Sequence, residues 1–211
     1  MGSMTTLERA LGRARNADVG DRARSAADRI ADRAVNDGLL DVAYATLDTP
    51  VGKVLVAATR RGLVRISFGA VYDFESVLAD LSARVSPRLL ESPGYFDGVR
   101  KELEEYFEGR RTSFDVPVAL HGTPFQRRVW EALLEIPYGE TTSYGELARR
   151  LGSPRAMRAV GLANGRNPVA VIVPCHRVIG ADGTLTGYGG GLERKRLLLE
   201  LESRRLAPSM F

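Results

Sequence analysis

The chain contains a single cysteine, Cys175, among its 211 residues. One cysteine cannot form an internal disulfide. With only His121 and His176 beside it, the chain cannot build a zinc site of four cysteines, or of two cysteines and two histidines. The fold must therefore be held together by a hydrophobic core, and this length is sufficient for one domain or two small ones. The 44% hydrophobic and 27% charged fractions are typical of a globular protein.

The charge balance narrows the choice of partners only slightly. The formal net charge of +4 weakly favours nucleic acid, but a solvated surface of arginine, glutamate and aspartate explains it equally well. No apolar run is long enough to cross a bilayer, and the N-terminus lacks the apolar core of a signal peptide. We therefore expect an intracellular, cytoplasmic protein without a membrane partner.

Residues 1–37 are expected to form a helical N-terminal extension. Residues 1–3 resemble an expression tag, and Ala23, Ala27, Ile30 and Ala34 recur at helical spacing. The apolar stripe is thin, so these helices could pack on the body, fray, or mediate contacts with a partner or between copies of the chain.

Residues 38–116 predict a small α/β domain. Apolar runs indicate strands at residues 42–46, 53–58 and 63–68, and helical periodicity indicates helices at 74–85 and 98–108. The second helix places Val99, Leu103 and Tyr106 on one apolar face. This region shows no cluster of catalytic residue types, so we expect it to be a scaffold.

Residues 117–211 predict a mostly helical domain. Thr123, Pro124 and Gln126 form a capping box with proline at the first helical position, and Ser143 with Glu146 predicts a second box. A third helix is expected from residue 155 to about 162, and a last helix from 192 to about 204. The second and third helices, joined by a tight turn at Gly152, are typical of a helix-turn-helix.

The third of these helices combines small residues with two arginines, Arg155 and Arg158. Its small residues are Ala156, Ala159, Gly161 and Ala163. A smooth helix with a projecting arginine suits close approach to the DNA minor groove. Close packing against another helix also requires small residues, and the pattern favours neither explanation.

Cys175 follows an apolar run at residues 169–173, which predicts a buried strand ending at Pro174. A lone cysteine is most often an inert buried residue. It becomes a nucleophile when a base removes its proton, and His176 is such a base in the next position. Adjacent side chains point apart on extended backbone, so a bridging water is more plausible than a direct bond. A glycine-rich loop around Tyr188 lets backbone approach a planar ligand.

These motifs together resemble those of the O6-alkylguanine-DNA alkyltransferases, over about residues 41 to 205. The segments that carry the resemblance are Ser143-Tyr144-Gly145-Glu146-Leu147, Arg158-Ala159-Val160-Gly161, Asn164-Gly165-Arg166-Asn167-Pro168, Val173-Pro174-Cys175-His176-Arg177-Val178 and Gly187-Tyr188-Gly189-Gly190-Gly191. The resemblance implies a ribonuclease-H-like α/β domain followed by a winged-helix-like DNA-binding domain. It also implies irreversible repair of O6-alkylguanine in double-stranded DNA, once per molecule, with no cofactor or metal.

The resemblance also implies roles for individual residues. Cys175 would take the alkyl group, with His176 as its base through a water, Glu202 orienting His176, and Asn167 supporting the turn. Tyr144 would help to rotate the nucleotide and would donate to guanine N3. Arg158 would fill the vacated stack, and the other residues expected to meet the groove are Arg155, Ala156, Ala159 and Gly161. The residues expected to form the base pocket are Tyr188, Gly189, Val178 and Pro174.

Three other functions are compatible with parts of the pattern. A damage sensor related to the alkyltransferases binds lesions without transfer, but such proteins lack the cysteine. A helix-turn-helix regulator would not need Cys175, His176 and Glu202 together. A cysteine hydrolase would need an oxyanion hole, and no hydrolase signature is present. Met157 and Leu162 stand where smaller residues are common beside the arginine, and the sequence leaves the accepted alkyl groups open.

Overall fold

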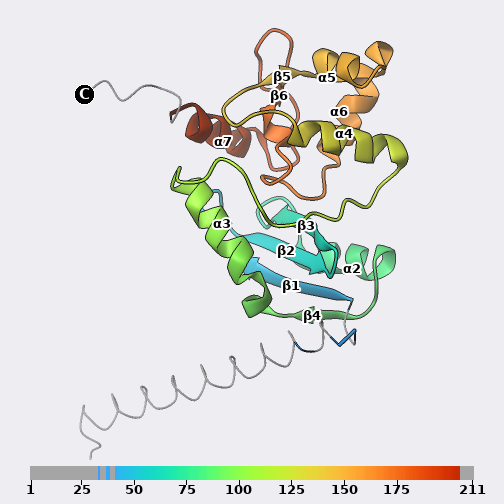
Figure 1. Ribbon diagram of the computed structural model, residues 1–211, viewed down its shortest axis with the longest axis vertical. Coiled ribbons are helices and arrows are strands. Elements are labelled where there is room, and N and C mark those ends of the chain that lie inside the picture. The colour runs from blue at the N-terminus through green and yellow to red at the C-terminus, as the bar shows by residue number, and fades with distance from the viewer. Residues whose placement is uncertain (1–32, 34–36, 39–40, 205–211) are drawn as a thin grey trace, which may run out of the picture.

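The computed structural model describes residue 33, residues 37–38 and residues 41–204. The expected helical extension and its proposed self-contacts lie almost entirely outside these residues. Figure 1 shows a sheet-containing part below a helical part, joined by a segment that follows α3 (Asp97–Phe107). No helix in the described ranges is long and apolar enough to span a membrane.

The first part is built on a sheet whose strand order is β3-β2-β1-β4. Neighbouring strands run antiparallel except for β4, which is parallel to β1. The strands are β1 (Val42–Leu47), β2 (Val54–Thr59), β3 (Gly62–Phe68) and β4 (Leu89–Glu91). The three strands predicted from the sequence are thus confirmed, while the short β4 was not anticipated.

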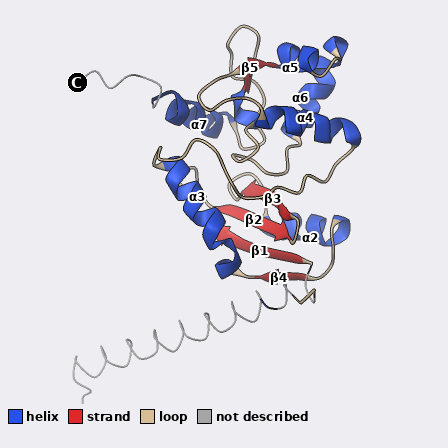
Figure 2. Cartoon of the chain, viewed as in Figure 1, coloured by secondary structure: helices blue, strands red, loops and turns tan. Residues whose placement is uncertain are grey.

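A helix covers each face of this sheet, as Figure 2 shows. Along β2, Val54 and Val56 belong to the core shared with α3, whereas Leu55 belongs to a separate core shared with α2 (Phe74–Arg84). Because successive side chains of a strand point to opposite faces, β2 must be apolar throughout to serve both cores. The core on the α3 side continues without interruption into the second part.

The edge strand β3 joins the two parts through backbone hydrogen bonds. The N–H of Leu63 donates to the Pro117 carbonyl at 2.8 Å, and the N–H of Ile66 donates to the Pro168 carbonyl at 2.8 Å. An otherwise unpaired sheet edge is thereby satisfied. The second of these bonds fixes the segment that leads to Cys175 against the sheet.

The second part contains four helices in its described residues. They are α4 (Pro124–Leu134), α5 (Tyr144–Arg150), α6 (Met157–Gly165) and α7 (Leu192–Arg204). The capping box of α4 is confirmed, and Ser143 caps α5 by accepting from the N–H of Glu146. One 3₁₀ turn, η2 (Pro154–Ala156), precedes α6, which ends later than expected. The short strand β5 (Thr142–Ser143), which directly precedes α5, pairs in parallel with β6 (Val178–Ile179), and this pairing connects α5 to the segment after Cys175.

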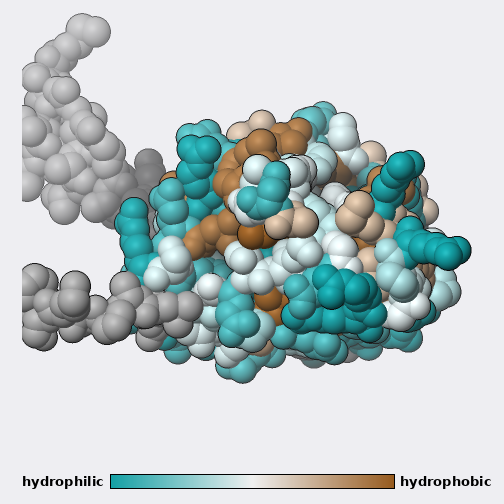
Figure 3. Space-filling model, turned by 90° about the horizontal axis from the view of Figure 1, so that it is seen from above, coloured by the Kyte–Doolittle hydropathy of each residue, from teal (hydrophilic) through white to brown (hydrophobic). Residues whose placement is uncertain are grey.

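The surface at the α5 and α6 end carries both apolar and charged side chains. Figure 3 looks onto the molecule from above and shows apolar patches bordered by hydrophilic ones. On α6, Met157 is 51% and Leu162 57% exposed, and Arg158 between them is exposed as well. This end of α6 is therefore a mixed surface, in which an exposed arginine lies between two exposed apolar side chains.

The predicted strand at residues 169–173 is wrong. All five residues are buried, but Val171 has a φ of 73°, and the N–H of Val173 donates to the Val169 carbonyl at 3.0 Å, which closes a tight turn. A short buried apolar run does not by itself distinguish a strand from a packed loop. The Asn167 side chain accepts from the Val169 N–H at 3.0 Å and donates to the Val173 carbonyl at 2.7 Å. These two bonds replace the hydrogen bonds that a neighbouring strand would supply, and they stabilise the loop.

Gly62 provides a test of the junction between the two parts. Its φ is +123°, and a Cβ there would collide with the Pro117 carbonyl oxygen that the neighbouring Leu63 N–H binds. Gly62→Ala should therefore lower the free energy of unfolding by about 3 kcal/mol in a denaturant titration. The matched control is Gly109→Ala, with a φ of +71° and open space around it. It should cost only about 1 kcal/mol, and equal losses in both variants would contradict the account.

Candidate active site

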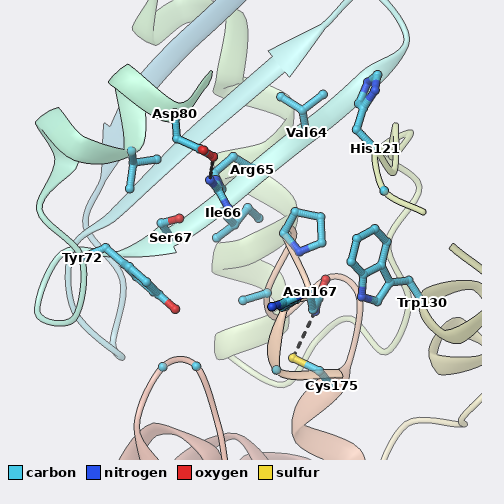
Figure 4. Close-up of a pocket in the computed structure, with 18 of the residues that line it drawn as sticks. Val64, Arg65, Ile66, Ser67, Tyr72, Asp80, His121, Trp130, Asn167 and Cys175 are labelled. Carbon is cyan, nitrogen blue, oxygen red and sulfur yellow. Dashed lines mark hydrogen bonds and ion pairs between the residues drawn. The ribbon is translucent and has the colours of Figure 1, made fainter. Parts of the chain in front are cut away.

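Cys175 begins a single 3₁₀ turn, η3 (Cys175–Arg177), directly after Pro174. Its thiol faces a cavity of about 580 Å³ that lies between the two parts of the molecule. Figure 4 shows Cys175 and Trp130 on one side of this cavity and the strand carrying Ile66, with Tyr72 beside it, on the other. The cysteine is only 4% exposed, so a reactant must enter this cavity to reach the sulfur.

Asn167 holds the sulfur in place. Its Nδ2 donates to Cys175 Sγ at 3.0 Å and to the Val173 carbonyl at 2.7 Å. Because the same side chain also fixes the turn at residues 169–173, the position of the thiol is set by the loop before it. The amide also stabilises negative charge on the sulfur, since a donor to the thiolate favours the charged form.

Glu202 on α7 is fully buried and accepts five hydrogen bonds. Oε1 accepts from Tyr106 Oη at 2.7 Å, from Arg177 Nη2 at 2.9 Å and from His176 Nε2 at 2.9 Å. Oε2 accepts from Arg177 Nε at 2.9 Å and from the Gly139 N–H at 3.1 Å. Burial alone would raise the pKa of this carboxyl, but the bonds from His176 and Arg177 outweigh it and hold the pKa at about 2.

The ionised carboxylate fixes the tautomer of His176. A carboxylate can only accept, so Nε2 of His176 carries the proton and Nδ1 is the acceptor. Nδ1 is buried and has no hydrogen-bond partner among the described residues. Burial lowers the pKa of His176, and the bond to Glu202 only partly offsets this, so the imidazole is neutral at neutral pH and can take a proton.

Lys195 is a fully buried cation beside the thiol. Its Nζ donates to the carbonyls of Val178 at 2.6 Å and Thr186 at 2.7 Å and lies 6.0 Å from the centre of the Tyr144 ring. Burial lowers its pKa to about 8. Burial also raises the pKa of the Cys175 thiol to about 11, against the Asn167 bond and the positive charge of Lys195. At pH 7 roughly one thiol in 10⁴ is therefore ionised, and a base is needed.

The glycine-rich loop packs against the first part of the molecule. A Cβ at Gly190 would lie 2.6 Å from the rings of both Phe68 and Tyr188, so only glycine allows this contact. The Tyr188 hydroxyl is buried without a hydrogen-bond partner among the described residues. Tyr144 reaches the same loop, because its hydroxyl lies 3.4 Å from the carbonyls of Thr186 and Gly187.

The structure brings most of the predicted site residues together. Cys175, His176, Asn167 and Glu202 form one connected cluster, and Tyr188 and Gly189 line the cavity with Cys175. Pro174 and Val178 are buried behind the cysteine and are not among the lining residues. On the helix expected to meet DNA, three predicted residues are exposed and two are half-buried: Arg155, Arg158 and Ala159, then Ala156 and Gly161.

Comparisons with known proteins identify both parts of the chain. Residues 42–120 match the ribonuclease-like domain of 6-O-methylguanine DNA methyltransferase, and residues 124–204 match its DNA-binding domain. The chain belongs to the 6-O-methylguanine DNA methyltransferase family. The predicted fold, a ribonuclease-like α/β domain followed by a mostly α DNA-binding domain, is thereby confirmed.

Individual relatives agree with this assignment. The chain is 52% identical to the methylated-DNA–protein-cysteine methyltransferase of Mycobacterium bovis over 77% of this chain and 93% of that protein. It is 48% identical to the enzyme of the same name from Methanosarcina acetivorans over 75% and 97%. The crystal structure of Mycobacterium tuberculosis OGT in complex with DNA matches with a TM-score of 0.68 and 50% identity, over 79% of this chain and 96% of that one.

Three residues of this candidate site were not predicted from the sequence. They are Tyr106, Arg177 and Lys195, all buried. A signal for Lys195 was present, because residues 195, 198 and 202 lie on one face of α7 and the middle one, Leu198, is core. Two charged residues on an apolar helical stripe indicate paired or functional groups. No three His, Cys, Asp or Glu side chains in the described ranges gather as a metal site would require.

Lys195→Met tests the electrostatic role of the buried cation. Removing a positive charge should raise the pKa of Cys175 further and lower its thiolate fraction, by about tenfold for each unit of pKa. The rate of Cys175 modification by methyl methanethiosulfonate should fall accordingly at pH 7, where Lys195 is mostly protonated. Lys101→Met, on the exposed surface of α3, is the matched control and should leave the rate unchanged. An unaltered rate in Lys195→Met would contradict the electrostatic role of Lys195.

Proposed function

We propose that this protein repairs DNA by direct reversal, transferring the alkyl group of O6-alkylguanine to Cys175 once per molecule. The observation that carries the proposal is the buried cluster in which Asn167 holds the thiol at a cavity and Glu202 holds His176 behind it. Family membership supports the reaction, since the named relatives are methylated-DNA–protein-cysteine methyltransferases.

The transfer is a displacement at the alkyl carbon. The S–C bond to Cys175 forms as the C–O6 bond breaks, and the bonding electron pair leaves on guanine. The thiol proton passes through a bridging water to Nδ1 of His176, the ring nitrogen left to accept. The guanine anion then takes up a proton, so the net change replaces the alkyl group on guanine by hydrogen. The thioether has no second cysteine to resolve it, and the protein stops after one transfer.

Hydrogen bonds to the leaving guanine lower the barrier because they strengthen as negative charge develops. We assign them to the Tyr144 hydroxyl at N3 and to the Gly189 N–H at O6. The carbonyls of Cys175 and Val178 would accept from the exocyclic amine, which distinguishes guanine from adenine. The Cys175 carbonyl already accepts from the Val178 N–H and from Asn164 Nδ2 at 3.4 Å, and the Val178 carbonyl accepts from Lys195 Nζ at 2.6 Å, so the guanine amine would share these acceptors.

DNA would approach over α5 and α6 through its minor groove. The exposed Arg158 would occupy the space that the damaged nucleotide leaves when it rotates into the cavity, since an O6-alkyl group inside the stack is out of reach. The exposed Met157 and Leu162 on either side supply apolar surface of the kind that enters between base steps. The helical extension at residues 1–37 stays a prediction, and within it residues 4–36 would tune DNA affinity or self-association.

The direct test is the intact mass of the protein after incubation with a duplex that contains one O6-methylguanine. Wild type should gain one methyl group in place of a hydrogen on every chain and then stop, and peptide mapping should place it on Cys175. Cys175→Ala should bind the duplex without gaining mass. Tight lesion binding without any mass gain in wild type would make this a sensor or regulator, and repeated turnover on esters or peptides would make it a hydrolase.

Arg158→Ala tests the approach to DNA. The rate of methyl transfer at limiting protein should fall by about tenfold or more, because the extrahelical state loses the side chain that fills the gap. Arg61→Ala, an exposed arginine of the β2–β3 hairpin, is the control for loss of one positive charge. Prior saturation of the duplex with netropsin, which fills the minor groove, should block wild-type transfer. Equal rates for Arg158→Ala and Arg61→Ala would contradict the assignment.

A further inference from the structure

Tyr106 connects the first domain directly to the carboxylate of the active site. It lies on α3, is completely buried, and donates from its hydroxyl to Oε1 of Glu202 at 2.7 Å across 96 positions of sequence. This is the same oxygen that accepts from Nε2 of His176 at 2.9 Å. An edge contact with Tyr138, 6.0 Å between ring centres, and a tilted contact with Phe114, at 5.2 Å, hold the phenol ring in place.

Packing alone does not require the hydroxyl. The buried face of α3 also contains Val99 and Leu103, and phenylalanine would fill the same space as the tyrosine ring. A buried hydroxyl costs free energy unless it is hydrogen-bonded, and here its partner is an ionised carboxylate, which forms the stronger kind of hydrogen bond. The hydroxyl therefore belongs to the polar site rather than to the scaffold.

We propose that Tyr106 is a positioning residue for His176. Its hydroxyl shares the Glu202 oxygen that holds the imidazole, and so limits how tightly that oxygen binds the His176 N–H. The geometry is independent of any substrate, whereas its importance for alkyl transfer rests on the function proposed above. The first domain is then part of the active centre, beyond the scaffold role expected from its sequence.

The electrostatic consequence has a definite sign. The charged groups that act on His176 are Glu202 and Lys195 from α7 and Arg177 from η3, with Cys175 next to it in the chain. Tyr106 from α3, with Tyr138 beside it, contacts the Glu202 carboxylate. Burial and the nearby carboxylate raise the pKa of Tyr106 far above its ordinary value, so the phenol remains a donor wherever the protein is folded. With this donor removed, Oε1 binds the His176 N–H more strongly and favours the imidazolium, which raises the pKa of His176.

The experiment compares wild type with Tyr106→Phe in the absence of DNA. Proton NMR at neutral pH should show the Nε2–H resonance of His176 moving downfield in the variant, since a stronger hydrogen bond deshields the proton. The carbon-bound ring protons of the exposed His121 are an internal reference and should not move. Leu103→Ala, one turn earlier on the same buried face of α3, is the control for simple loss of packing. An unchanged His176 resonance in Tyr106→Phe, or an equal shift in Leu103→Ala, would overturn the proposal.

The pH profile of methyl transfer gives a second readout. Glu202, with a pKa of about 2, stays ionised in the accessible range, so the acidic limb reports protonation of His176. Tyr106→Phe should move this limb to higher pH by about half a unit or more with DNA affinity unchanged. A limb at the same pH in both proteins counts against the proposal. If wild type transfers no alkyl group, the proposed function fails, and the His176 resonance still decides the role of Tyr106.

A measurement on wild type covers the case in which Tyr106→Phe does not fold. A buried hydroxyl bound to Glu202 should give a slowly exchanging phenolic proton, with a nuclear Overhauser effect to the His176 Nε2–H that shares the oxygen. Its detection would support the shared acceptor. Rapid exchange of the hydroxyl with solvent, or the absence of contact between the two protons, would refute it.

Discussion

The buried carboxylate of Glu202 is the interaction on which the rest of the site depends. An isolated ionised carboxylate could not remain in this core, because removal from water costs far more than one hydrogen bond returns. Five donors from four residues compensate for it. These donors come from α3, from the turn after α4 and from η3, while Glu202 itself lies on α7. One carboxylate thus joins both domains and fixes the turn that contains the nucleophile.

The same arrangement explains how an unreactive thiol becomes useful. Burial raises the pKa of Cys175 to about 11, which protects the cysteine from adventitious chemistry and leaves very little thiolate at neutral pH. Reactivity then requires a base, which in the proposed mechanism is His176, and the ionised Glu202 fixes the tautomer of that imidazole by accepting from its Nε2. The hydrogen bond from Asn167 and the positive charge of the buried Lys195 act against burial and lower the pKa of the thiol. The thiol therefore stays unreactive until a bound substrate places a leaving group next to it and a proton can pass from the thiol to the base.

Strain and close approach position these groups. Val171 adopts a positive φ inside a fully buried turn, and Asn167 supplies the hydrogen bonds that the turn lacks. On the opposite side of the cavity, glycine at position 190 lets the loop with Tyr188 rest on Phe68 of β3. The Ile66 N–H of β3 also donates to the Pro168 carbonyl in the segment before Cys175. Both walls of the cavity thus depend on contacts between the domains.

The sequence by itself determined the local elements and the chemistry. Short apolar runs placed the three long strands, the capping residues Thr123 and Ser143 placed two helices, and the motif around Cys175 identified the family. Residues 169–173 were misassigned because burial without periodicity is common to strands and packed loops. Only the tertiary structure placed Tyr106 on Glu202 and Lys195 beside Cys175. Hydrogen bonds between residues far apart in the chain follow from how the domains dock, and no local pattern of residues encodes that docking.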